Sequence, residues 1–306
     1  MKIKAFIYII LAGILWGTSG IFSEILTPYG FTALHITAMR GLVSFVCVLV
    51  YALIRDRKLF RVKFKELIVF ASIGMALFFT SSCYFTSMGM TSVPTAVVLM
   101  YTAPVYVMVF SVIFLKERLS ALKIAAVVSM LTGCVLVSGV IGGMKLDVLG
   151  FAIGIGSGIA YASYNVLTKI SMEHKSAPIS TVLYSFLTMT LISLCVSQPH
   201  KIITNTAKAP ALIIPLLLCL GIVTFVLPYL LYTLAMRDLS AGTASALSII
   251  EPMAATFFSI VIFKEPINMF SVCGILLILL AVVMLGIAEH AINNSKHKKE
   301  ACKEKQ

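Results

Sequence analysis

The chain has 306 residues, of which 60% are hydrophobic and 12% are charged. Soluble domains average roughly 45–50% apolar and 25% charged residues, so this composition excludes a soluble globular protein. Lysine and arginine outnumber aspartate and glutamate by 24 to 12, giving a formal charge of +12. Because these charges lie between apolar segments, they do not indicate a nucleic-acid surface.

Ten apolar stretches are each long enough to cross a bilayer core of about 30 Å, which needs about 20 helical residues. They are expected near 4–24, 32–54, 67–88, 92–115, 121–141, 148–170, 178–198, 210–235, 241–263 and 268–288. The sequence therefore predicts an all-α integral membrane protein with ten transmembrane helices, followed by a basic cytoplasmic tail over 291–306.

Basic residues predict the orientation, because cytoplasmic loops carry the excess of lysine and arginine. With a cytoplasmic N-terminus, 19 of the 24 basic residues lie on the cytoplasmic side, four lie outside, and Arg40 lies within the second helix. Both termini are therefore expected in the cytoplasm, in a multi-pass protein of the cell membrane. The basic face would contact anionic lipid headgroups.

The second half of the chain repeats the first. A shift of 148 residues aligns Tyr84–Glu117 with Tyr232–Glu265 without a gap and gives 11 identities in 34 positions. A weaker similarity at a shift of 145 aligns Gly13 with Gly158 and sets Trp16 against Tyr161.

This pattern predicts two five-helix repeats, over 1–145 and 146–290. Because five is odd, the second repeat enters the membrane inverted, as in many secondary transporters.

The repeat ends carry a resemblance to a known family. The segments from Ala103-Pro104 to Arg118 and from Glu251-Pro252 to Pro266, together with Gly13–Gly20 and Arg40, resemble the EamA-type family of the drug/metabolite transporter superfamily. The similarity covers roughly residues 4–288. It implies ten helices around a central cavity, alternating exposure of that cavity, and export of amino acids or other small metabolites.

Glu251 is the most informative single residue, because an ionisable group in hydrocarbon costs about 2.5–3.5 kcal/mol and requires a partner, water or a ligand. It lies about ten residues into the span 241–263, near mid-membrane. It is expected to bind an amino or cationic group or to carry a coupling proton; a structural pairing with Arg40 is the alternative. Arg40 itself has two candidate acidic partners in the spans, Glu24 and Glu251, and binding of a substrate carboxylate is its other expected role.

Aromatic residues fall into two groups. Trp16, Tyr101, Tyr161 and Tyr164 lie near mid-helix, where their polar atoms need either a cavity or an internal partner. The rings of Tyr8, Tyr29, Tyr84, Tyr229 and Tyr232 are instead assigned to anchoring belts at the membrane surface. Substrate is expected to contact Trp16, Ser19, Tyr101, Tyr161, Asn165, Ser248 and Glu251.

Pro104 and Pro252 are repeat mates and are expected inside helices, where a proline frees the carbonyl four residues earlier and permits a hinge. Gly150, Gly154 and Gly158 recur every four residues and predict close helix packing. Two Lys-Glu pairs at repeat-related helix ends, Lys116, Glu117, Lys264 and Glu265, are candidate gates.

These features predict a secondary or facilitative carrier that exports small polar metabolites by alternating access. The alternatives are a proton-coupled exporter of lipophilic cations and an integral membrane enzyme acting on a lipid phosphate. A small-molecule substrate is expected, with no catalytic residue, cofactor, metal or nucleotide, since no nucleotide-binding or hydrolase motif occurs. Monomer and homodimer remain equally compatible with the sequence.

Overall fold

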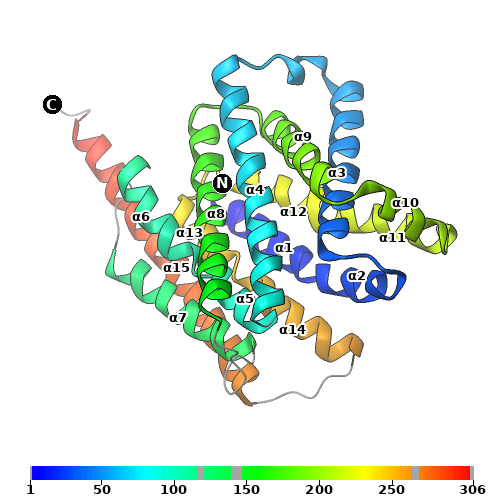
Figure 1. The fold of residues 1–306 in the computed structure, drawn as a ribbon. Coiled ribbons are helices and arrows are strands. Elements are labelled where there is room, and N and C mark those ends of the chain that lie inside the picture. The colour runs from blue at the N-terminus through cyan, green and yellow to red at the C-terminus, as the bar shows by residue number, and fades with distance from the viewer. Residues whose placement is uncertain (1, 92, 116–119, 139–146, 264–268, 304–306) are drawn as a thin grey trace.

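The computed structural model describes residues 2–91, 93–115, 120–138, 147–263 and 269–303, and every regular element among them is a helix (Figure 1). The first half contains α1 (Lys2–Gly17), α2 (Ser19–Leu26), η1 (Thr27–Tyr29), α3 (Ala33–Arg55), η2 (Arg57–Phe60), α4 (Phe64–Met90), α5 (Val93–Met100), α6 (Ala103–Leu115) and α7 (Ala121–Ser138). The second half contains α8 (Val148–Glu173), α9 (Pro178–Val196), α10 (Pro199–Ala207), α11 (Pro210–Gly221), the π-helical η3 (Ile222–Val226), α12 (Leu227–Ala235), α13 (Ala241–Leu247), α14 (Ile250–Phe263) and α15 (Met269–Lys303).

Seven helical segments among the described residues are long and apolar enough to cross a membrane. They are Ile3–Tyr29, Ala33–Arg55, Phe64–Met90, Thr95–Leu115, Pro178–Val196, Pro210–Ala235 and Ala241–Ile262. At the other three predicted spans the structure has two shorter apolar helices, Ala121–Leu136 and Val272–Leu285, and the 26-residue α8. The predicted all-helical membrane architecture is confirmed, and a count of ten crossing helices stays a prediction.

Two predicted helices are broken near their middle by hydroxyl groups that bond back to the main chain. Between α5 and α6, the Thr102 hydroxyl donates to the Leu99 carbonyl at 2.6 Å. Between α13 and α14, the Ser248 hydroxyl donates to the Ser245 carbonyl at 2.6 Å. Such bonds compete with the regular helical ladder, so each span consists of two shorter helices.

The breaks change the expected role of the two repeat-related prolines. Pro104 is the second residue of α6 and Pro252 the third residue of α14. In the first turn of a helix the missing N–H has no helical partner to lose, so proline fits there without kinking a continuous helix. The expectation that both prolines lie in helix interiors is therefore corrected: each begins a new helix directly after a break.

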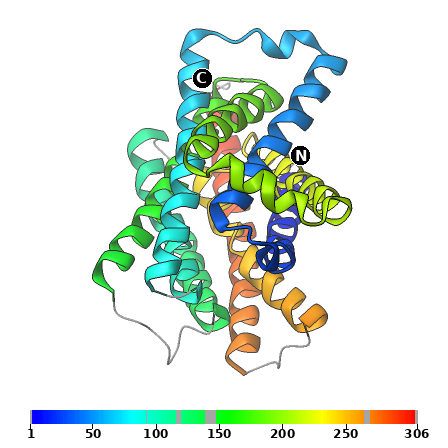
Figure 2. The ribbon, with the colours of Figure 1, turned by 45° about the vertical axis from the view of Figure 1, so that its right-hand side comes forward.

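The helices pack in pairs, as Figures 1 and 2 show from two directions. Helix α4 lies along α8, and α1 lies along α12. Helix α3 packs on α9, and α7 packs on α15. The α5–α6 pair contacts α8, while α13 and α14 contact α1. The largest apolar core lies between these pairs and includes Ile9, Phe186 and Leu247.

Small residues allow the closest of these contacts, as the glycine spacing predicts. A Cβ atom on Gly154 would lie 2.7 Å from the Ser87 hydroxyl, and one on Gly158 would lie 2.9 Å from the Thr102 hydroxyl. Both distances are too short for a real Cβ contact. The predicted close packing of α8 is confirmed at these two positions.

Hydrogen bonds tie the bundle at two opposite ends of α3. At one end, which we call the η2 side, Ser180 donates to the Leu59 carbonyl at 2.7 Å and Tyr184 to the Phe60 carbonyl at 3.1 Å. The η2 loop lies at the top of Figure 1. At the other end, the α10 side, Asn205 donates to the Gly30 carbonyl at 2.8 Å.

Candidate functional site

Glu251 lies in the first turn of α14, directly after the break that follows α13. Its side chain is half-buried, and the Tyr101 hydroxyl faces its carboxyl group. The carboxyl also lies within electrostatic range of the guanidinium of Arg40 and of the phenols of Tyr84, Tyr161 and Tyr229. Helices α3, α4, α8 and α12 thus contribute polar groups around one central carboxylate.

Arg40 occupies the same interior region from α3. Its guanidinium carbon lies 4.7 Å from the centroid of the Phe225 ring. Among the described residues, no carboxylate oxygen lies within the 4.0 Å that defines an ion pair with it. Of its two predicted acidic partners, Glu251 is within electrostatic range, whereas Glu24 is exposed on α2.

An aromatic cluster lies beside this charged pair. We define it as Trp16, Tyr161, Tyr164, Phe186, Phe225, Tyr229 and Tyr232. The Trp16 ring centroid lies 5.1 Å from that of Tyr229 and 5.4 Å from that of Tyr232. Tyr161 and Tyr164 stack at 5.8 Å, and Tyr164 meets Tyr229 edge-on at 5.6 Å. The cluster joins α1, α8, α9, η3 and α12 in the interior of the bundle.

Asn165 holds part of this cluster in place. Its side-chain oxygen accepts a hydrogen bond from the Tyr232 hydroxyl, and its amide nitrogen donates to the Tyr161 carbonyl at 2.6 Å. Asn165 is fully buried. The structure therefore places this predicted contact residue behind Tyr232, as the group that fixes the Tyr232 ring.

Several buried polar atoms of the site have no hydrogen-bond partner among the described residues. They include the Trp16 indole nitrogen. The hydroxyls of Tyr101 and Tyr164 also form no hydrogen bond of regular geometry, although Glu251 faces the first and Thr168 and Thr233 face the second. A buried polar group without a partner costs about 1–3 kcal/mol, so each such atom calls for a water molecule or a ligand. Two of the three belong to residues predicted from the sequence to bind substrate.

The remaining predicted contacts differ in their surroundings. The Tyr161 hydroxyl faces Ser248 at the α13–α14 break. Ser19 is half-buried at the start of α2, and its neighbour Gly20 has no atom within 4 Å of an added Cβ. The candidate gate residues Lys116, Glu117, Lys264 and Glu265 lie outside the described residues.

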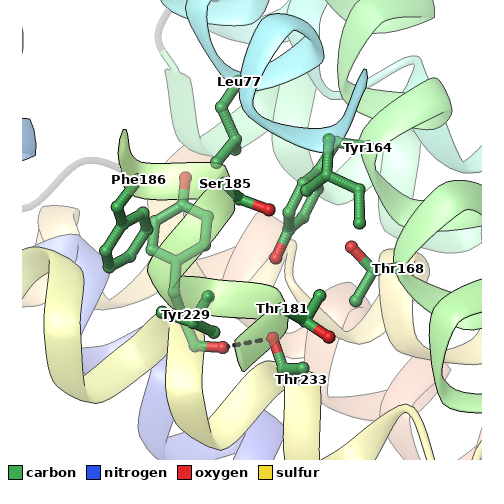
Figure 3. A pocket seen from close by; sticks show the side chains of 10 residues that line it. Leu77, Tyr164, Thr168, Thr181, Ser185, Phe186, Tyr229 and Thr233 are labelled. Carbon is green, nitrogen blue, oxygen red and sulfur yellow. Dashed lines mark hydrogen bonds between the residues drawn. The ribbon is translucent and has the colours of Figure 1, made fainter. Parts of the chain in front are cut away.

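A small cavity borders the aromatic cluster on its η2 side (Figure 3). Its volume is about 10 Å³. That is about enough for one water molecule. Its lining residues are Ile73, Leu77, Tyr164, Thr168, Thr181, Val182, Ser185, Phe186, Tyr229 and Thr233. The bundle is closed to anything larger than water at this position.

The assignment of three tyrosines to surface belts needs correction. Tyr232 is fully buried and Tyr229 is half-buried within the aromatic cluster, while Tyr84 is half-buried near Glu251. Their spacing offered a signal, because Phe225, Tyr229 and Tyr232 follow each other at four and three residues and so share one helix face. Their depth along the predicted spans indicates a position at the membrane surface instead. In the structure α1 and α8 cover this face of α12 and bury the rings.

Comparison with known proteins identifies the family. The model of the EamA-like transporter family matches residues 3–139 and again residues 148–287. The chain belongs to the EamA-like transporter family, and it is a multi-pass membrane protein. This membership points to transport rather than catalysis.

Two bacterial relatives are similar along nearly their whole length. An uncharacterized transporter of Clostridium kluyveri is 26% identical over 97% of this chain and 94% of its own. The uncharacterized transporter YwfM of Bacillus subtilis is 24% identical over 92% of this chain and 93% of its own. A solved crystal structure with 17% identity covers 95% of this chain and 99% of its own with a TM-score of 0.78, which supports the fold.

Proposed function

We propose that the chain is a secondary carrier with ten membrane-crossing helices in two inverted repeats, 1–145 and 146–290. The family model matches the chain twice, once in each proposed repeat. Helix packing supports the duplication, because the contact of α4 with α8 has its counterpart in the contact of α12 with α1. The contacts of α3 with α9 and of α7 with α15 pair each helix with its own repeat mate.

Two glycines support the same relationship. A Cβ on Gly13 would lie 3.2 Å from the Ile250 side chain, and one on Gly158 would lie 2.9 Å from the Thr102 hydroxyl. The shift of 145 aligns the two glycines, and the shift of 148 aligns Thr102 with Ile250. Repeat-related glycines therefore pack against repeat-related helix breaks, which accidental similarity does not explain.

The proposed substrate is a small zwitterionic metabolite such as an amino acid. The observation that carries this proposal is that Arg40 and Glu251 share one interior region without an ion pair within 4.0 Å. Opposite charges held apart suit a ligand with a carboxylate and an ammonium group, each of which finds a charged partner. The aromatic cluster beside them suits an apolar side chain.

The proposed orientation places the η2 side and both termini in the cytoplasm of a cell that exports the metabolite. The excess of basic residues in the loops at that side supports this orientation. No catalytic residue, cofactor or metal is part of the proposal. Small-molecule substrate and anionic lipid headgroups are the proposed partners.

Export of lipophilic cations is the second candidate, because one carboxyl group surrounded by tyrosine rings also suits a cation. Arg40 separates the two candidates. A positive charge beside the site disfavours a purely cationic substrate, whereas it favours a substrate with a carboxylate.

Counterflow in proteoliposomes tests the carrier function. Labelled amino acids and labelled lipophilic cations are offered in parallel to vesicles that contain unlabelled compound. A carrier accelerates uptake when unlabelled substrate waits inside, which neither an enzyme nor a structural protein does. No acceleration with any small metabolite would contradict the proposal.

Replacing Glu251 with glutamine tests the central carboxyl. Glu251→Gln should weaken apparent affinity for an amino-group substrate roughly 10- to 100-fold, because a hydrogen bond to a charged group contributes about 1.5–3 kcal/mol. Protonation removes the same charge, so acidification should lower wild-type transport toward the level of the variant. The variant itself should respond little to acid.

Glu24→Gln is the matched control, since Glu24 is exposed on α2. Its counterflow rate and pH profile should equal those of the wild type. A wild-type profile in Glu251→Gln would remove Glu251 from the mechanism and leave the carrier function itself untouched.

A further inference from the structure

Two buried hydroxyl groups line the small cavity. Tyr164 is 2% exposed and Thr168 is 1% exposed. Their hydroxyls face each other, but neither forms a hydrogen bond of regular geometry among the described residues. Figure 3 shows the hydroxyls of Tyr164, Thr168 and Ser185 around the same space. A volume of about 10 Å³ with such a lining meets the requirements of a bound water molecule.

Polar groups continue from the cavity toward the η2 side. The Ser171 and Thr181 hydroxyls are hydrogen-bonded at 3.0 Å, and Thr181 also lines the cavity. One step further, the Ser176 hydroxyl donates to the Glu66 carboxylate at 3.1 Å. A row of hydroxyls inside an otherwise apolar bundle provides a polar route from the aromatic cluster to the end of α8.

The cavity corresponds by repeat to the region around Arg40. Helix α3 begins at Ala33 and α9 at Pro178, which are 145 residues apart. The same shift aligns Arg40 with Ser185, a cavity residue.

Their packing is equivalent as well. An added Cβ on Gly74 of α4 would lie 2.8 Å from the Thr188 side chain, and one on Gly221 of α11 would lie 2.6 Å from the Val43 side chain. The shift of 145 aligns Val43 with Thr188.

The two equivalent regions differ in how open they are. Arg40 and Ser19 are half-buried, whereas their equivalents Ser185 and Tyr164 are each 2% exposed. The side chains around Arg40 are thus more accessible than their counterparts, where the space is closed down to the size of a water molecule. In an inverted-repeat carrier, the two repeats exchange these states during transport.

We propose that the cavity lined by Tyr164, Thr168 and Ser185 is the closed η2-side half of the substrate pathway and holds one water molecule in this state. This inference rests on the proposed carrier function. When the bundle opens at the η2 side, the cavity widens, and its hydroxyls solvate the polar end of the departing substrate. The water molecule occupies that place while the pathway is closed.

Side-specific labelling of introduced cysteines tests the assignment. Ser185→Cys and Thr168→Cys are each treated in sealed vesicles with a membrane-impermeant maleimide from one face at a time. Lys58→Cys on η2 and Lys201→Cys on α10, both exposed, mark the two faces. The wild-type chain sets the background from its native cysteines.

Both cavity variants should react from the face that labels Lys58→Cys, and from that face alone. Their rates should be roughly 0.1–10% of the Lys58→Cys rate, the usual population of a minor conformation. Thr190→Cys is the matched control, because Thr190 is a buried residue of the same helix that packs against Gly41. It should stay unlabelled from both faces.

Labelling from the α10 face, or none at either face while Lys58→Cys reacts, would overturn the assignment. If Ser185→Cys does not fold, Thr168→Cys decides alone. The result is separable from the carrier test: η2-side labelling without counterflow would retain the pathway and reject the proposed substrates. Counterflow without η2-side labelling would retain the carrier and reject this pathway.

Discussion

Arg40 is held in the interior by an aromatic face instead of a carboxylate. Its guanidinium lies 4.7 Å from the Phe225 centroid. A desolvated cation–π contact contributes about 2 kcal/mol, whereas placing the charge in a span costs about 2.5–3.5 kcal/mol. The contact therefore does not fully compensate the charge, and the Nε atom has no hydrogen-bond partner among the described residues. An anionic group of a substrate would compensate the charge and accept a hydrogen bond from the Nε atom.

Substituting Arg40 separates its charge from its shape. Arg40→Lys should lower apparent affinity for a carboxylate substrate roughly 2- to 10-fold, because lysine keeps the charge and loses both the planar stacking on Phe225 and the bidentate geometry. Arg40→Gln should abolish counterflow of such a substrate. Concentration series of counterflow measure both effects.

Phe225→Leu is the companion variant, since it removes the ring and leaves the guanidinium. Its affinity should fall by about as much as that of Arg40→Lys. Wild-type affinity in both Arg40 variants would exclude Arg40 from substrate binding.

Charged residues of the site could be predicted from the sequence, and its aromatic neighbours only in part. Arg40 and Glu251 stand out because ionisable groups are rare in apolar spans. Phe225 gives no such signal, since phenylalanine is ordinary in a membrane helix. Sequence position places Tyr229 at the membrane surface, because depth along a span says nothing about which neighbouring helix covers a side chain.

At the scale of the helix, glycine positions decide how closely the elements approach. A Cβ on Gly17 would lie 2.8 Å from the Ala254 side chain and 3.0 Å from the Glu251 carbonyl. Because the second atom belongs to the main chain, it cannot move aside without shifting α14. Gly17 thus holds α1 against the turn that carries Glu251.

Alanine at two nearby glycines should have opposite effects on stability. Gly17→Ala should destabilise the protein by about 1–3 kcal/mol, the usual cost of overpacking. Gly20→Ala should stabilise it by about 0.4–1 kcal/mol through the unfolded chain, because nothing lies within 4 Å of the added methyl group. Thermal unfolding in detergent measures both variants against the wild type. Equal unfolding temperatures would contradict the close contact at Gly17.

The apolar length of each segment predicts that it is a helix and gives the order of the helices along the chain. It does not predict the breaks within the spans. Pro104 and Pro252 indicate an irregularity in each helix. The sequence alone does not distinguish a proline that kinks a continuous helix from one that begins a new helix. The hydroxyls of Thr102 and Ser248 decide between them by bonding back to carbonyls three residues earlier. That choice depends on the close approach of α8 and α1, which only the assembled bundle provides.

At the scale of the whole molecule, hydrogen bonds from two buried lysines hold the η2 side closed. The Lys169 ammonium of α8 donates to the Met236 carbonyl at the end of α12, at 3.0 Å, and lies 3.8 Å from the Glu173 carboxylate. The Lys123 ammonium of α7 donates to the Ser240 hydroxyl at 2.6 Å. The Lys123 contact joins the two proposed repeats, and the Lys169 contact joins two helices of the second repeat. Both lie at the end that must separate for substrate to pass.

Removing the Lys169 contact should shift the molecule toward opening at the η2 side. Lys169→Met keeps the length of the apolar stem and loses the charged hydrogen bond, which contributes about 1.5–3 kcal/mol. The population open at that side should therefore rise roughly 10- to 100-fold, and labelling of Ser185→Cys in the double variant should accelerate by that factor. Lys175→Met, exposed at the same end of α8, should leave the rate unchanged. Because the bond closes one end only, labelling of the buried Thr190→Cys should not respond. Equal acceleration at Ser185→Cys and Thr190→Cys would mean general loosening of the bundle instead of release of a closed half.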